Sequence, residues 1–329
     1  VAISGTVTVD GSAGITGDLK VDGSAEFNGT MNATGNLSGS GSIVFNGIAS
    51  ASGANMGTGS SVTYNAGEKV INGTYNSLTL NGNPYTAENV MVNGTATINA
   101  EVTSSGKLIF GENGTVIQGK DGKIISTGEV VYSGRGAVLS GSYQTLTISG
   151  EGQVAGNITL NGSLNYTGSG LKVDGVFTNH SSVTLDGSSA NFNTVINNGE
   201  FHVAGDYNNF AGEFVNNNLL EVSGNDNTFE QVVNNGEFNL TGNRNSFSTV
   251  TNRNNFTIFG DSNKIGALNN SGVTNINGSN TSVGSFNNTG MGIIYDHGQM
   301  WMVSGANDLN ATSFPSQNKL NFSSLAMLL

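Results

Sequence analysis

Histidines and carboxylates are the residues of this chain that could cleave a glycosidic bond. Such a site needs two carboxylates about 5 to 10 Å apart, commonly with a cation on the same face. His180, His202 and His297 are scattered along the chain. Glu200 and Glu237 occupy equivalent repeat positions, but they lie two repeats apart. The sequence therefore predicts no catalytic pair, and we expect that the protein is not an enzyme.

The remaining acids mark turns, and some could bind calcium. Several stand directly before glycine, which is first a turn signal: Asp10, Asp22, Asp174 and Asp186. Asp206, Asp226 and Asp261 lie among asparagines, and such oxygen-rich turns can ligate Ca²⁺. The Gly-Gly-x-Gly-x-Asp nonapeptide of calcium-binding β-rolls is absent. We therefore expect no cofactor, with calcium at these turns as the alternative.

A repeat of about 18 residues positions these side chains between Phe192 and Gly298. One apolar column contains Phe192, Phe210, Phe229, Phe247, Ile265 and Val283, and a second contains Val195, Phe214, Val232, Val250, Leu268 and Phe286. Two further columns, beginning at Phe201 and Val203, are two residues apart, as in a β-strand. Such columns indicate that each repeat stacks on the previous one as a solenoid coil.

Asparagine follows the same period. The predicted structural ladder consists of Asn197, Asn216, Asn234, Asn252, Asn270 and Asn288. At about 4.8 Å per coil, each amide can donate to one neighbouring coil and accept from the other. A second ladder is expected at Asn208, Asn227, Asn245 and Asn263. Both ladders are interpreted as structural turn residues.

Two other repeats lie upstream. Val70–Gly82 matches Val138–Gly150 at an offset of about 68 residues, which corresponds to between three and four coils. Near the start, Val7–Ser12 recurs as Leu19–Ser24 after about 12 residues, which predicts shorter coils. We therefore predict a narrow or irregular solenoid in 1–69, a central solenoid in 70–190, regular coils in 191–298 and a cap or assembly segment in 299–329.

Composition excludes several classes of protein. Only 10% of residues are charged, against about 25% in ordinary domains, but 36% are hydrophobic, which argues against disorder. The net charge of −12 and the lack of a basic cluster exclude a nucleic-acid partner. No apolar run is long enough for a transmembrane segment. The chain has no cysteine and begins at Val1, which fits a mature chain whose export signal has been removed.

The repeat units resemble those of known secreted proteins. Asn197–Gly205 and Asn234–Gly242 resemble repeats of filamentous-haemagglutinin-like proteins and autotransporter passengers. The central unit, Gly73-Thr-Tyr-Asn-Ser-Leu-Thr-Leu80 with Val90-Met-Val-Asn-Gly-Thr95, is similar to repeats of large bacterial surface adhesins. The resemblance implies an all-β fold, a right-handed single-stranded parallel β-helix, in a protein at the cell surface. It carries no catalytic residues.

Three functions follow as hypotheses. The leading one is an extracellular structural protein, a subunit of a filament, sheath or surface layer, that self-associates end to end into a homopolymer. The first alternative is an adhesin stalk or passenger that binds a host, cell-surface or carbohydrate ligand, and the second is a polysaccharide-active enzyme. The assembly or capping candidates are Val1, Ile3, Val7, Val9, Trp301, Phe314, Phe322, Leu325 and Leu329.

Overall fold

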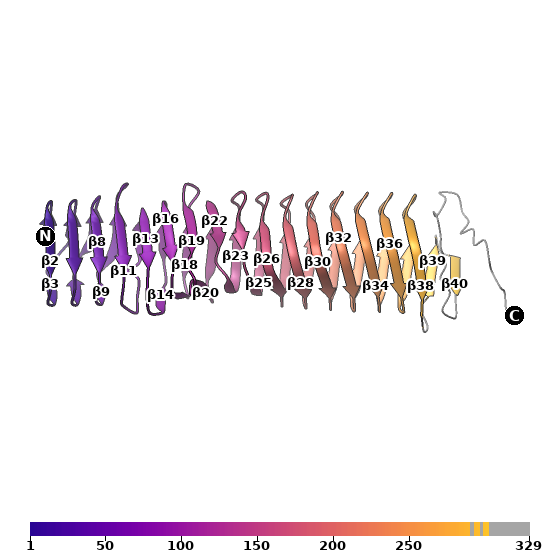
Figure 1. Ribbon diagram of the computed structural model, residues 1–329, viewed down its shortest axis with the longest axis horizontal. Coiled ribbons are helices and arrows are strands. Elements are labelled where there is room, and N and C mark those ends of the chain that lie inside the picture. Colours follow the sequence, from indigo (N-terminus) through magenta and orange to yellow (C-terminus); the bar gives the residue numbers. More distant parts are fainter. Residues whose placement is uncertain (290–292, 297–298, 303–329) are drawn as a thin grey trace. The chain divides into compact units, whose positions relative to one another are not determined.

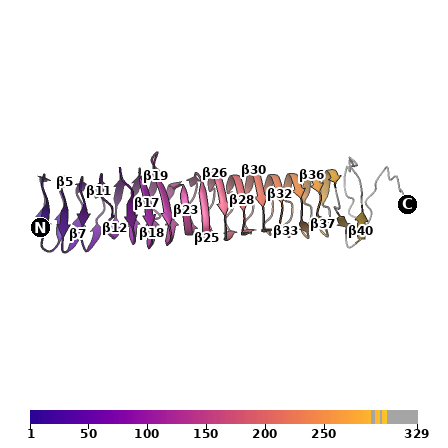
Figure 2. The same ribbon diagram turned by 90° about the horizontal axis from the view of Figure 1, so that it is seen from below.

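The computed structural model describes residues 1–289, 293–296 and 299–302. All regular structure in these ranges is β-strand, and the chain divides into two compact units, Val1–Leu164 (unit 1) and Asn165–Leu329 (unit 2). Within each unit the strands of successive coils lie side by side, as both views show (Figures 1 and 2). The coils are parallel and number about 16 in all. The predicted all-β parallel solenoid is confirmed.

Most coils of unit 1 have three strands, and each strand contributes to one of three faces. The first face contains β1 (Ala2–Ile3), β4 (Leu19–Val21), β7 (Asn36–Gly39), β10 (Gly53–Met56), β12 (Gly73–Tyr75), β15 (Val90–Val92), β18 (Lys107–Phe110) and β21 (Glu129–Tyr132). The second contains β2 (Thr6–Val9), β5 (Ser24–Phe27), β8 (Ser42–Phe45), β11 (Ser61–Tyr64), β13 (Ser77–Leu80), β16 (Thr95–Ile98), β19 (Thr115–Gln118), β22 (Arg135–Val138) and β24 (Val154–Ala155). The third contains β3 (Ala13–Ile15), β6 (Met31–Ala33), β9 (Ala49–Ser50), β14 (Tyr85–Ala87), β17 (Glu101–Ser104) and β20 (Lys123–Ser126). β23 (Gly141–Ile148) pairs with both β20 and β21, and the division between the units falls within β25 (Ile158–Tyr166).

The first coils are not shorter than the later ones. Ile3 pairs with Val21, Val7 with Ala25 and Ile15 with Ala33, so the coil step is already 18 residues. The predicted 12-residue coil is wrong because Val7–Ser12 and Leu19–Ser24 begin on different faces, β2 and β4. Both faces are built from a similar short strand followed by a Gly-containing turn. The strand and turn of one face therefore resemble those of the other face 12 residues later.

The 68-residue repeat also moves between faces. Tyr64 ends β11 on the second face, whereas its counterpart Tyr132 ends β21 on the first. The repeated sequence therefore returns after a number of coils that is not an integer. This agrees with the predicted offset of between three and four coils. It builds the same buried contact twice, because the hydroxyls of Tyr64 and Tyr75 are 3.2 Å apart and those of Tyr132 and Tyr143 are also 3.2 Å apart.

This tyrosine pair predicts a loss of stability at high pH. Burial raises the pKa of Tyr64 to about 12, against about 10 in an unfolded chain. A raised pKa gives a contribution that is complete below about pH 10 and is lost as the pH rises toward 12, on the order of 2 to 3 kcal/mol. We expect the melting temperature to fall steeply between about pH 10 and pH 12, and we expect Tyr64→Phe to reduce the slope of melting temperature against pH. Tyr207→Phe is the control because Tyr207 is 65% exposed, and an equal slope in all three proteins would contradict the prediction.

Unit 2 has two strands per coil, a long one and a short one. The long strands are β26 (Lys172–Asn179), β28 (Asn191–Asn197), β30 (Asn209–Asn216), β32 (Thr228–Asn234), β34 (Ser246–Asn252), β36 (Lys264–Asn270) and β38 (Ser282–Asn288). The short strands are β27 (Ser182–Leu185), β29 (Glu200–Val203), β31 (Leu219–Val222), β33 (Glu237–Leu240), β35 (Asn255–Ile258), β37 (Val273–Ile276) and β39 (Ile293–Asp296), and β40 (Gln299–Met302) follows them. The pairings of β26 with β28, β28 with β30 and β30 with β32 each contain a register shift, because β26 and β30 are one residue longer than the strands they pair with.

The predicted apolar columns form the core of unit 2. Phe192, Phe210, Phe229 and Phe247 are at most 1% exposed and pair in register from coil to coil. Their rings stack with centroid distances of 5.3, 4.3 and 4.9 Å. Parallel stacking in register places identical side chains over one another, so this aromatic column fills the interior of these four coils continuously.

Candidate functional site

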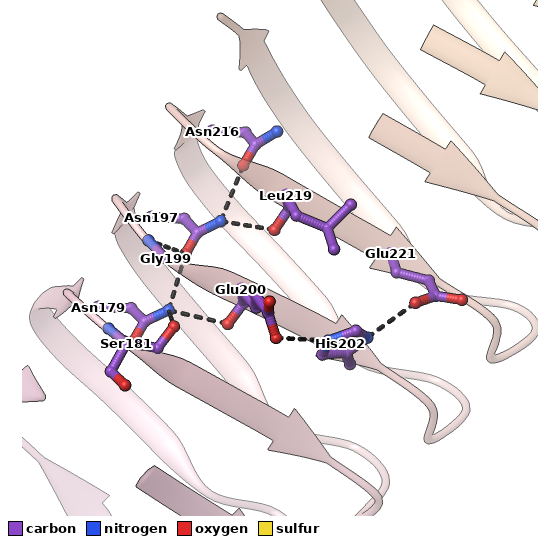
Figure 3. Close-up of polar contacts among 9 residues, drawn as sticks. All are labelled: Asn179, Ser181, Asn197, Gly199, Glu200, His202, Asn216, Leu219 and Glu221. Carbon is purple, nitrogen blue, oxygen red and sulfur yellow. Dashed lines mark hydrogen bonds and ion pairs between the residues drawn. The ribbon is translucent and has the colours of Figure 1, made fainter. Parts of the chain in front are cut away.

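The predicted asparagine ladder lies where each long strand of unit 2 turns into the short strand (Figure 3). The Nδ2 of Asn197 donates to the Oδ1 of Asn216 at 2.8 Å, and the same contact links each member to the next as far as Asn288. Asn197 Nδ2 also donates to the carbonyl of Leu219 at 2.8 Å. Each side chain is at most 2% exposed, so these bonds satisfy amides that have no access to water.

The ladder begins one coil earlier than the sequence analysis placed it. Asn179 is fully buried, and its Nδ2 donates to Asn197 Oδ1 at 2.8 Å and to the carbonyl of Glu200 at 2.9 Å. Its Oδ1 accepts the backbone N–H of Ser181 at 3.0 Å. Asn179 precedes Asn197 by one coil period, and that spacing was the signal that could have identified it.

The second ladder uses the backbone as its donor. The N–H of Asn208 donates to Oδ1 of Asn227 at 2.7 Å, and Asn227 and Asn245 continue the series. The residue before each of these asparagines has a positive φ, including Tyr207 at 59° and Arg244 at 55°. The left-handed turn residue points its own side chain outward, while the following asparagine is buried and connects the coils.

The acids considered for calcium already have partners. Asp206 accepts the N–H of Asn225 at 2.6 Å, and Asp261 accepts that of Ser279 at 2.7 Å. Asp226 binds Arg244 through two hydrogen bonds of 2.9 and 2.7 Å, and this partner lowers the pKa of its carboxyl. Within the described ranges no group of three or more acidic, histidine or cysteine side chains could hold a metal ion.

A third ladder, in unit 1, was not predicted. Asn28 Nδ2 donates to Asp10 Oδ1 at 2.9 Å, and the amides of four later coils donate in turn toward the N-terminus. These are Asn46, Asn65, Asn81 and Asn99. Their spacing varies between 16 and 19 residues, which hides them from a search for a fixed period. Donation runs toward the N-terminus here and toward the C-terminus in the buried ladder that begins at Asn179.

His202, Glu200 and Glu221 form a partly exposed group of polar side chains in unit 2 (Figure 3). His202 Nδ1 lies 2.8 Å from Glu221 Oε2, and its Nε2 lies 3.8 Å from Glu200 Oε2. Glu200 and Glu237 pair with opposite sides of Leu219, which places them two coils apart. His180 is elsewhere, 3.5 Å from Asn198, and His297 lies outside the described residues. Such exposed pairs are worth about 1 kcal/mol or less.

The assembly candidates at the start of the chain lie on the first coil. Among the described residues, β1, β2 and β3 each pair on one side only, with β4, β5 and β6. Val1 and Val7 are 65% and 38% exposed, whereas Ala25, which stacks on Val7, is 1% exposed. Ile3 and Val9 are half-buried. In the part of the chain that the structure describes, no further strand packs over the inward-facing apolar side chains of this coil.

The candidates in the last segment can be placed only in part. β40 pairs antiparallel with β39, and its Trp301 lies opposite Ile294 in the backbone register. This pairing departs from the parallel stacking of the preceding coils. Phe314, Phe322, Leu325 and Leu329 lie outside the described residues.

Comparison with known proteins gives no relative. No protein-family model matches the chain, and no curated protein or solved structure matches it significantly. In the part of the chain that the structure describes, no helix is long and apolar enough to cross a membrane.

Proposed function

We propose that this chain is an extracellular structural protein, a subunit of a cell-surface filament, sheath or surface layer that grows by end-to-end stacking of solenoid coils. The observation that carries the proposal is the stacking itself: β1, β2 and β3 pair in parallel register with β4, β5 and β6, and within the described residues they pair on that side only. Unpaired strand edges are templates for another chain, and a head-to-tail contact that does not close forms a fibre.

The energetics favour covering this coil. The apolar residues that line it, including Ile3, Val7, Val9 and Ile15, are partly exposed, whereas their partners in the next coil are at most 3% exposed. Completing the burial of one such side chain stabilises by up to about 1.5 to 3 kcal/mol. We propose that the occupant is a coil of a second copy, because a coil built on the same 18-residue pattern matches the edges and the core.

The repeat resemblance and the composition support the same proposal. Amides and hydroxyls in place of charges, no cysteine and repeats similar to those of bacterial surface proteins are features of the secreted β-helix class. The ladders, the glycine turns and the aromatic columns all serve the stacking of coils.

Replacing Val7 tests this assembly. We expect the wild-type protein to form polymers near neutral pH and Val7→Asp to remain monomeric, because stacking would bury an unpaired carboxylate. Light scattering and electron microscopy measure the polymers, and circular dichroism checks that the variant folds. Thr6→Asp is the matched control, since Thr6 is the exposed neighbour whose partner Ser24 faces outward. A monodisperse wild-type monomer, or polymerisation of Val7→Asp, would refute the proposal.

A further inference from the structure

Unit 1 carries a groove that the assembly proposal does not use. It has a volume of about 510 Å³ and lies where the second face turns into the third. Three successive turns form it. The first has four residues, Asn81 to Pro84, the next has two, Asn99 and Ala100, and the third has four, Gly119 to Gly122. The short turn makes the floor, and the longer turns on both sides make the walls.

The third turn is held rigidly. Gly122 N–H donates to the carbonyl of Gly119 at 3.1 Å, and Gln118 Nε2 donates to the carbonyl of Gly122 at 2.7 Å. The Oε1 of Gln118 accepts the N–H of Ser140 at 3.2 Å, which attaches the turn to the next coil. A Cβ on Gly122 would lie 2.1 Å from the carbonyl oxygen of Ile98, so only glycine fits. A wall fixed in advance loses little entropy when a ligand binds.

The groove offers balanced charges. Lys123 and Glu101 form an ion pair of 2.7 Å. Lys120 and Asp121 are exposed on the wall, and neither has an ion pair or a side-chain hydrogen bond within the described residues. Two cations and two anions give the groove no net charge, although the chain carries −12. Hydrogen-bond donors and acceptors on Lys120 and Asp121 are therefore available next to each other. Because the groove has no net charge, it does not favour a charged ligand over a neutral one.

These features point to one class of ligand. The walls are two coil steps apart, about 9 to 10 Å between backbones, which admits a single sugar ring between them. A peptide strand has no edge to extend, because β16 and β17 pair with other strands on both sides. Hydroxyl groups can accept from the Lys120 ammonium and donate to the Asp121 carboxylate. We infer that the groove binds a short segment of a neutral polysaccharide.

Calorimetry with defined sugars tests the inference. The probes are neutral hexasaccharides of glucose, galactose, mannose and N-acetylglucosamine, with hexagalacturonate as the anionic comparison. We expect at least one neutral probe to bind, and Lys120→Ala and Asp121→Ala each to weaken it about tenfold or more. No binding of a neutral probe, or tighter binding of hexagalacturonate, would overturn the inference.

Two controls separate the groove from folding and from assembly. Gly111–Gly114 is an equivalent turn, with Gly114 N–H donating to the Gly111 carbonyl at 2.9 Å, and it lies outside the groove. Glu112→Ala in that turn should leave sugar binding unchanged, and equal weakening by this variant would count against the site. Val7→Asp should retain sugar binding while it loses assembly, so the two proposals can fail independently.

Discussion

Gly242→Ala is expected to destabilise unit 2 by about 4 kcal/mol or more, or to prevent its folding. A Cβ at this position would lie 1.9 Å from the backbone oxygen of Gly224 in the preceding coil. The coil cannot move away, because Thr241 and Gly242 both donate to the carbonyl of Val222, at 2.9 and 3.0 Å. The same clash recurs at Gly205, Gly260 and Gly278, which explains why this column contains glycine.

Urea unfolding followed by circular dichroism would measure the effect, and hydrogen exchange would locate it. Gly57→Ala is the control, since a Cβ there lies at an ordinary contact distance of 3.4 Å from the carbonyl oxygen of Gly39, and we expect a change of no more than about 1 kcal/mol. If Gly242→Ala were as stable as Gly57→Ala, the coils would be able to separate locally, and the proposed close stacking would be wrong.

Asn234→Ala is the second large effect, and we expect a loss of about 3 kcal/mol from unit 2. Asn234 is fully buried in the middle of the ladder, where its Nδ2 donates to Asn252 Oδ1 and to the carbonyl of Asn255, both at 2.8 Å. Its Oδ1 accepts from Asn216 at 2.8 Å. Removing the amide leaves buried groups on both neighbouring coils without this partner, and buried polar groups are costly when unpaired.

The adjacent residue supplies a matched control. Asn235 donates to Asn217 Oδ1 at 2.8 Å in an exposed setting, where water can replace the bond. We expect Asn235→Ala to cost less than about 1 kcal/mol in the same unfolding experiment. Equal losses in the two variants would show that burial does not determine the strength of the ladder.

Much of unit 2 could be predicted from the sequence because its period is nearly constant, at 18 or 19 residues. Residues separated by one period, such as Phe192 and Phe210, pair directly, so the columns, the strands and the predicted ladder follow from one another. Unit 1 was harder because its coils vary in length and because two of its faces share a turn sequence. The 12-residue similarity between Val7–Ser12 and Leu19–Ser24 was therefore assigned to successive coils, although it relates two faces of the solenoid.

The candidate sites could likewise be predicted only where they follow a regular sequence period. Asn179 could have been found by extending the period, but the unit 1 ladder from Asp10 to Asn99 has no fixed spacing. The groove near Lys120 and Asp121 was also missed, because it depends on the relative lengths of three turns and not on a motif.

The sequence by itself determined the all-β solenoid and the inward columns of unit 2, because strand alternation and coil spacing are local and periodic. Only the tertiary structure decided which face each strand joins, in which direction each ladder donates and where a groove opens. Those properties depend on how turns that are about 18 residues apart align along the solenoid axis. A difference of two residues in the length of one turn decides whether that turn forms the floor or a wall of the groove.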